Sequence, residues 1–175
     1  MQVLGIGKST VAAAVFAKLK EIGYNAELVT EYAKDCVYEE RFKTLKDQVY
    51  MLGKQYHRIK NTLDSADILI VDSPILLSYI YFKYNKLDKE IDNNIFKNFT
   101  FELERSLSCK KVNIFLTKNE SYFQESGRIH SNDESKFIQN SILDMLNENN
   151  VNYIKINNEF KNLNSTVESI LNVIF

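Results

Sequence analysis

The sequence has little that would cross-link it or anchor it in a membrane. Its two cysteines, Cys36 and Cys109, form no CxxC pair, so two reduced thiols are expected rather than a disulfide framework. No apolar run approaches the roughly 18 residues of a membrane-spanning helix. The first residues also lack the basic-then-apolar pattern of a signal peptide. We therefore expect a cytoplasmic protein, in the host cytoplasm if a phage encodes it, with no membrane partner.

An excess of positive charge is also lacking. The chain has 22 Lys and Arg against 23 Asp and Glu, a net charge of -1. Non-specific nucleic-acid binders normally carry a basic excess, so nucleic acid is a possible partner that the composition does not indicate. Proline is scarce, with Pro74 alone. The length of 175 residues fits one globular domain with its own core, and nothing in the sequence indicates an oligomeric state.

A glycine-rich run near the start points to phosphate binding. The residues Gly5-Ile6-Gly7-Lys8-Ser9-Thr10 lead directly into an apolar helical pattern. This is the end of a P-loop, in which backbone N–H groups and the helix dipole bind an anion. Lys8 would reach the β- and γ-phosphates, and Ser9 would offer its hydroxyl to Mg²⁺. The alternative is an ordinary turn in which Ser or Thr caps a helix.

The residues before this run are fewer than a full P-loop requires. The pattern G-x-x-x-x-G-K-[ST] places its first glycine five residues before Gly7, where the chain has Gln2. Either Met1–Leu4 is a short strand with a shortened loop, or the natural N-terminus is longer. We expect the second, and with it a first strand that is truncated or missing from the centre of the sheet.

The rest of the chain alternates between helical and strand patterns. Apolar spacing predicts helices over 8–22, 38–65, 75–84, 88–107, 134–148 and 165–174, with a possible break near Gly53. Strands are expected over 25–31, 67–72, 111–117 and 151–156. This alternation predicts an α/β fold, a three-layer α/β/α sandwich around a parallel sheet.

Ligands bind at the carboxyl ends of strands in such sheets, so the residues there are candidates. Asp72 follows the buried strand at the position of a Walker B carboxylate and would serve Mg²⁺ or the acceptor hydroxyl; alternatively it caps the next helix. Glu31 ends the preceding strand and would orient an acceptor hydroxyl, or is a solvated surface residue. Arg128, in the polar stretch 118–133, would neutralise phosphate charge, or is a plain surface residue.

A weaker set of candidates lies on the helix after Glu31. Gln48, Gln55 and Arg58 recur at helical spacing, and glutamine amides can pair with a nucleobase or carboxamide edge. The alternative is a solvated helix face. The sequence Thr117-Lys118-Asn119-Glu120 does not match the Asn-Lys-x-Asp motif of GTPases, so a GTPase is disfavoured. No Ser-His-Asp set, HExxH motif or zinc-ligand spacing is present, which disfavours the corresponding hydrolases.

Four segments together carry a family resemblance: Gly7-Lys8-Ser9-Thr10, Glu31-Tyr32-Ala33, Ile70-Val-Asp72-Ser73-Pro74 and Gly127-Arg128. In this order they resemble the P-loop kinases of nucleosides and nucleotides. More narrowly, they look like phage and bacterial AAA-family ATPase proteins related to the nicotinamide riboside kinase domain of the NadR type.

The resemblance implies a sheet of order 2-3-1-4-5, ATP and Mg²⁺ as cofactors, and one kinase-like domain over 1–175 with a LID-like loop at about 118–133. It implies that Gly5, Gly7, Lys8, Ser9 and Thr10 bind the nucleotide, with Thr10 at the α-phosphate, and that Ser9 and Asp72 serve the metal. Lys8, Glu31, Asp72 and Arg128 would be the catalytic residues.

The expected activity is ATP-dependent phosphoryl transfer to a small nucleoside- or nucleotide-like substrate, with catalysis by positioning and charge neutralisation. Two alternatives stay open at this stage. One is a P-loop ATPase acting as a regulatory or switch module. The other is a kinase acting on a nucleic-acid end or base.

Overall fold

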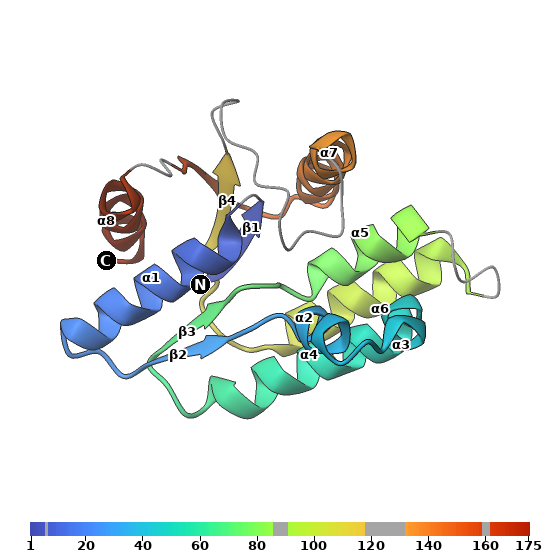
Figure 1. Cartoon of the computed structure of the whole chain (residues 1–175), viewed down its shortest axis with the longest axis horizontal. Helices are drawn as coiled ribbons and strands as arrows, with labels where there is room; N and C mark the ends of the chain where they lie inside the picture. Colours follow the sequence, from blue (N-terminus) through green and yellow to red (C-terminus); the bar gives the residue numbers. More distant parts are fainter. Residues whose placement is uncertain (6, 86–90, 118–131, 159–161) are drawn as a thin grey trace.

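Five parallel strands form the centre of the computed structural model (Figure 1). The structure describes residues 1–5, 7–85, 91–117, 132–158 and 162–175. The sheet has the order β2-β3-β1-β4-β5, which confirms the predicted topology. Its strands are β1 (Gln2–Gly5), β2 (Ala26–Val29), β3 (Ile68–Val71), β4 (Asn113–Thr117) and β5 (Ile154–Asn157).

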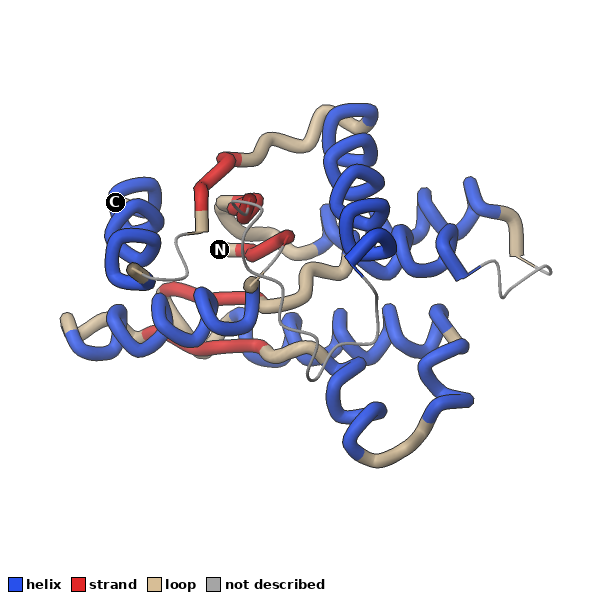
Figure 2. The backbone as a smooth tube through the Cα atoms, turned by 45° about the horizontal axis from the view of Figure 1, so that its top comes forward, coloured by secondary structure: helices blue, strands red, loops and turns tan. Residues whose placement is uncertain are grey.

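Helices cover both faces of this sheet, which gives the three expected layers (Figure 2). They are α1 (Lys8–Glu21), α2 (Tyr32–Tyr38), α3 (Phe42–Lys46), α4 (Gln48–Leu63), α5 (Leu76–Asn85), α6 (Asn93–Ser106), α7 (Asn132–Glu148) and α8 (Leu163–Ile174). Helices α1 and α8 pack on one face, and α4, α5, α6 and α7 on the other. Within the described residues, none of the helices combines the length and apolar character needed to span a membrane.

Strands β3 and β4 carry apolar residues on both sides because both faces of the sheet are covered there. Successive side chains of a strand point to opposite faces, so Ile70 packs with α1 and α8 whereas Leu69 and Val71 pack with α4, α5 and α6. Strand β4 divides in the same way, with Ile114 on the first face and Phe115 on the second. This double burial explains the continuous apolar runs of the sequence.

The first strand, expected to be truncated or missing, is present at the centre of the sheet, so the expectation that it is missing is wrong. All four residues of β1 pair with β4, and Val3 and Leu4 are completely buried. On the other side the strand is short, since its only register pair with β3 is Gln2 with Val71. The backbone N–H of Val71 donates to the carbonyl of Met1 at 2.9 Å. Full pairing with β4 and the burial of Gln2, Val3 and Leu4 stabilise this strand of four residues.

The segment 38–65 is also broken differently from the prediction. It contains the end of α2, then α3 and α4, whereas Gly53 lies inside α4. The first break lies at Glu40, whose φ of 56° ends the helical backbone, and Arg41 N–H returns to the carbonyl of Cys36 at 2.8 Å. Asp47 makes the second break, because its side chain accepts from the N–H of Tyr50 and caps α4.

Candidate active site

The turn between β1 and α1 is short and depends on two glycines. Gly5 has φ +91° and Gly7 has φ +77°, both in the region that favours glycine. A Cβ on Gly5 would lie 2.3 Å from the main-chain oxygen of Leu116 in the neighbouring strand, so no side chain fits there. This close approach makes it possible for the chain to leave a central strand and start a helix within two residues.

The N-terminus of α1 has the features of an anion site. Gly7 is its N-cap, and no side chain caps the helix. Ser9 and Thr10 lie inside α1 rather than at its cap, which contradicts the alternative of a simple capped turn. The first N–H groups of a helix have no partners within the helix, and the dipole gives this end positive character. The arrangement can therefore hold a phosphate group.

Three of the sequence-predicted residues meet beside this helix end. The Nζ of Lys8 lies 2.6 Å from Oε2 of Glu31 and 3.9 Å from Oδ1 of Asp72. Glu31 follows β2 and Asp72 follows β3, and the last residues of these strands, Val29 and Val71, are register partners. Because parallel strands end at the same edge, the two carboxylates emerge together and Lys8 lies between them.

The charges of this group act on one another. Burial by itself would lower the pKa of Lys8, but the negative charges of Glu31 and Asp72 outweigh it and raise the pKa above its ordinary value of 10.5. Lys8 is therefore an ammonium throughout the neutral range. Tyr81 of α5 lies close enough to feel these charges: burial, and then the charge of Glu31, raise the pKa of its phenol, while Lys8 opposes the shift.

A second lysine belongs to the site and was missed by the sequence reasoning. Lys34, in the first turn of α2, donates from Nζ to the hydroxyl of Ser9 and lies 3.0 Å from Oδ2 of Asp72. It follows Glu31 by three residues, and residues at this spacing share one side of a helical turn. That spacing was the available signal. Tyr81 had no comparable signal, because it lies in a helix rich in tyrosine.

The oxygen atoms at this point fit a magnesium ion. Oδ1 of Asp72 is buried and accepts no hydrogen bond within the described part of the chain. The Ser9 hydroxyl and Asp72 converge on the same Lys34 nitrogen, so they lie within reach of one cation. Among the described residues no three His, Cys, Asp or Glu side chains cluster as metal ligands. Mg²⁺ needs no such cage, since it usually binds through one or two carboxylates, waters and phosphate oxygens.

Two of the weaker candidates, Gln55 and Gln48, form hydrogen bonds with backbone groups and are not free to contact a substrate through these atoms. Oε1 of Gln55 accepts from the N–H of Tyr32 at 3.0 Å, and its Nε2 donates to the carbonyl of Thr30 at 3.3 Å. These bonds hold the turn that carries Glu31. Gln48 donates to the carbonyl of Leu45 at 2.7 Å. Both glutamines are buried, so neither lies on a solvated face.

The remaining candidates are placed as follows. The guanidinium of Arg58 pairs with Asp35 and lies 4.8 Å from the centre of the Tyr32 ring, next to the turn after β2. Thr10 is exposed on the first turn of α1. Arg128 lies outside the described residues, as does the LID-like loop up to residue 131.

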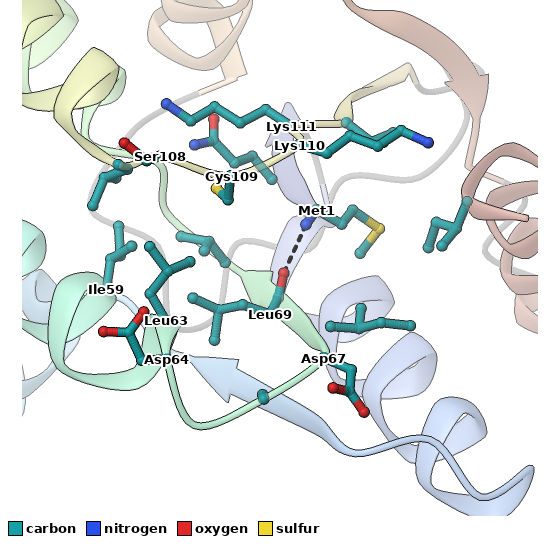
Figure 3. A pocket seen from close by; sticks show the side chains of 17 residues that line it. Met1, Ile59, Leu63, Asp64, Asp67, Leu69, Ser108, Cys109, Lys110 and Lys111 are labelled. Atoms are coloured by element: carbon teal, nitrogen blue, oxygen red, sulfur yellow. Dashed lines mark hydrogen bonds between the residues drawn. The ribbon is translucent and has the colours of Figure 1, made fainter.

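A cavity of about 320 Å³ lies at the opposite end of the sheet (Figure 3). Met1, Leu69 and Lys111 are among its lining residues, and the amino group of Met1 donates to the carbonyl of Leu69 at 2.7 Å. Neither Lys8 nor Asp72 lines it. The cavity sits at the amino ends of β1 and β3, and it is separate from the candidate active site.

Comparison with known proteins agrees with this geometry. The sequence model of the AAA domain family matches residues 4–162. The chain belongs to the AAA domain family. No curated protein matches it in sequence.

Solved structures with a similar fold include a nucleoside kinase and a nucleotide kinase. Deoxyadenosine kinase from M. mycoides with bound dCTP superposes with a TM-score of 0.65 at 21% identity, over 99% of this chain and 98% of that chain. Thymidylate kinase from Candida albicans gives a TM-score of 0.59 at 13% identity, over 99% and 89%. The predicted P-loop α/β fold is thereby confirmed for this AAA domain protein, whereas a relation to nicotinamide riboside kinases stays a prediction.

Proposed function

We propose that this AAA domain protein transfers the γ-phosphoryl group of ATP to a hydroxyl of a small nucleoside- or nucleotide-like acceptor. One observation carries the proposal. Lys8, Glu31 and Asp72 converge at the uncapped N-terminus of α1, at the edge of the sheet where the parallel strands end. Phosphoryl transfer needs an anion site, a cation and a group that handles the acceptor hydroxyl, and this edge provides all three.

The phosphate chain would be held by the first turn of α1. Its free N–H groups bind phosphate oxygens, and the Lys8 ammonium neutralises charge on the group in transfer. Lys8 is paired with Glu31 in the free protein, so it must exchange this carboxylate for the phosphates. A Mg²⁺ ion, when bound, neutralises negative charge on the phosphate oxygens. Ser9 and Asp72 are the residues that would hold it.

Glu31 would act on the acceptor. Its carboxylate is mostly buried, and Gln55 fixes the turn that carries it, so its position is defined. Once Lys8 has moved to the phosphates, Glu31 is free to accept a hydrogen bond from the attacking hydroxyl and to take its proton. The fold shared with kinases of deoxyadenosine and thymidylate supports a nucleoside-like acceptor for that hydroxyl. Arg128 remains our candidate for closing over the phosphates.

The test is incubation with ATP, Mg²⁺ and a panel of nucleosides, deoxynucleotides, nicotinamide riboside and a short oligonucleotide. We expect a phosphorylated small molecule whose formation matches the ADP released. A rate of ADP release that is the same with and without each acceptor would contradict the kinase proposal and indicate an ATPase. Phosphate transferred only to the oligonucleotide would indicate a kinase of nucleic-acid ends.

A pair of lysine variants links the activity to the site. Lys8→Met removes the ammonium at the phosphates, and we expect transfer to fall by about 100-fold or more. Lys20→Met removes a lysine farther along α1, where Nζ lies 3.6 Å from the exposed Glu27. It changes the net charge equally and should leave transfer unaltered. Circular dichroism of both variants checks that the fold is retained.

A further inference from the structure

A lysine ammonium lies where the proposed metal ion would bind. The Nζ of Lys34 donates to the Ser9 hydroxyl and lies 3.0 Å from Oδ2 of Asp72. These are the two side chains whose oxygen atoms fit Mg²⁺. Lys34 thus already provides the positive charge that joins the P-loop to the end of β3.

The ammonium and a magnesium ion cannot share these oxygens. Magnesium binds its oxygen ligands at about 2.0–2.1 Å in near-octahedral geometry and carries two positive charges. A nitrogen in hydrogen-bond contact with both Ser9 and Asp72 occupies the space between them, and its charge repels a second cation. Binding of the metal through these residues therefore requires Lys34 to leave.

Lys34 is able to move into water at a smaller cost than Lys8. The Lys34 side chain is 40% exposed and extends from a helix of seven residues, so its ammonium can turn into water. The Lys8 side chain is 17% exposed and contacts two carboxylates. Asp72 is 3% exposed, and a buried carboxylate without a counter-charge is unfavourable. In the free protein Lys34 helps to meet that need.

We infer that Lys34 is an internal cation that competes with Mg²⁺ for Ser9 and Asp72 and is displaced when the metal–nucleotide complex binds. The inference rests on the proposed function, because that function places the metal at these residues. It assigns Lys34 a role in setting how much metal the protein requires. Removing the ammonium should make metal binding tighter, the opposite of what the loss of a metal-site residue normally does.

Metal affinity can be measured without turnover. Mn²⁺, which replaces Mg²⁺ and has a paramagnetic signal, is titrated against the protein with and without ADP, and the free ion is followed by electron paramagnetic resonance. Lys34→Met keeps the length and apolar stem of the side chain. We expect it to bind Mn²⁺ about tenfold more tightly than the unaltered protein, because the oxygens are no longer occupied by a competitor.

Lys20→Met is the matched control. Its side chain is 43% exposed and ion-paired, and the substitution removes the same single charge from a position outside the site. We expect less than about a twofold change in Mn²⁺ affinity, since an exposed charge acts weakly through solvent. A gain confined to Lys34→Met separates competition at the site from a general electrostatic effect.

Lys34→Gln provides a second variant if Lys34→Met does not fold, as judged by its unfolding transition. Mn²⁺ affinities of the Lys34 variants that equal or fall below that of the unaltered protein overturn the inference. Transfer by the unaltered protein is measured separately. An active kinase whose Lys34 variants gain no metal affinity refutes only the Lys34 role. An inactive protein whose Lys34 variants gain metal affinity supports that role and contradicts the proposed kinase function.

Discussion

Single residues in the candidate site form an alternating row of charges. Glu31, Lys8, Asp72 and Lys34 follow one another at ion-pair distances, with two carboxylates and two ammonium groups. Each buried charge therefore has a counter-charge in the free protein, which offsets its desolvation. Binding of a nucleotide and metal would draw both lysines away from these carboxylates.

Tyr81, which lies beside this row of charges, is expected to make the free energy of unfolding depend on pH. Burial and the charge of Glu31 raise the pKa of its phenol above the ordinary 10.0, so at high pH the unfolded chain loses this proton before the folded one. The folded state then binds more protons, and the free energy of unfolding falls as the pH rises beyond about 10. We expect Tyr81→Phe to show a smaller loss of stability between about pH 9 and pH 11 in urea unfolding.

The control for that titration is Tyr24→Phe. The Tyr24 ring is half-exposed and stacks on Phe175, whose ring centroid is 4.7 Å away, at the far end of α1. The substitution Tyr24→Phe removes a phenol hydroxyl at a position outside the candidate site. Equal pH dependence in Tyr81→Phe and the unaltered protein would mean that Tyr81 does not titrate with the site.

Among the elements, the join between β1 and α1 is under the tightest constraint. Strand β1 pairs with β4 along its whole length, and Gly5 lies directly opposite Leu116. The backbone must then change from strand to helix between Gly5 and Lys8, and the positive φ angles of Gly5 and Gly7 allow this change. Since the phosphate site consists of this helix start, strand pairing and anion binding depend on the same glycines.

Two glycine substitutions test this constraint. In Gly5→Ala the new Cβ meets a main-chain oxygen at 2.3 Å and the residue keeps a φ of +91°, so we expect a loss of about 2 kcal/mol or more in the free energy of unfolding. In Gly53→Ala nothing lies within 4 Å, and α4 should be stabilised by about 0.5–1 kcal/mol. Chemical denaturation measures both. Similar effects of the two changes would contradict the constraint at Gly5.

At the scale of the whole molecule, the sheet collects the site from separate segments. Lys8 starts α1, Glu31 follows β2 and Asp72 follows β3, and all lie at the carboxyl edge. The cavity that Met1 and Leu69 line is at the other edge. The candidate active site and this cavity are thus at opposite ends of the strands, and the site lies where ligands bind in α/β sheets, at the strand carboxyl ends.

Because a nucleotide would contact several of these segments, it should stabilise the entire fold. A ligand that binds only the folded state at about 100 times its Kd adds about 2.7 kcal/mol of stability. We expect ATP with Mg²⁺ to raise the Tm, and ATP with a chelator to raise it less. In Lys8→Met the rise should be mostly lost. An unchanged Tm of the unaltered protein at millimolar ATP and Mg²⁺ would contradict nucleotide binding.

Much of this arrangement could be predicted from local patterns. The apolar run before Asp72 predicted β3. The rule that ligands bind at the carboxyl ends of strands predicted Glu31 and Asp72 as site residues. The rule could not identify Lys34, because its partners Ser9 and Asp72 are 25 and 38 residues away in the chain. The buried Gln55 looked like a surface or substrate residue for a similar reason, since its partners lie at the end of β2.

The sequence by itself determined the alternation of elements, the parallel sheet and the identity of the P-loop, because each follows from apolar periodicity or from a short motif. Only the tertiary structure decided that Gln2–Gly5 form the central strand, since β4 pairs with all four residues and Val3 and Leu4 are completely buried. It also decided which charges meet. Ion pairs depend on distances across strands, and those distances are set by packing that no local pattern contains.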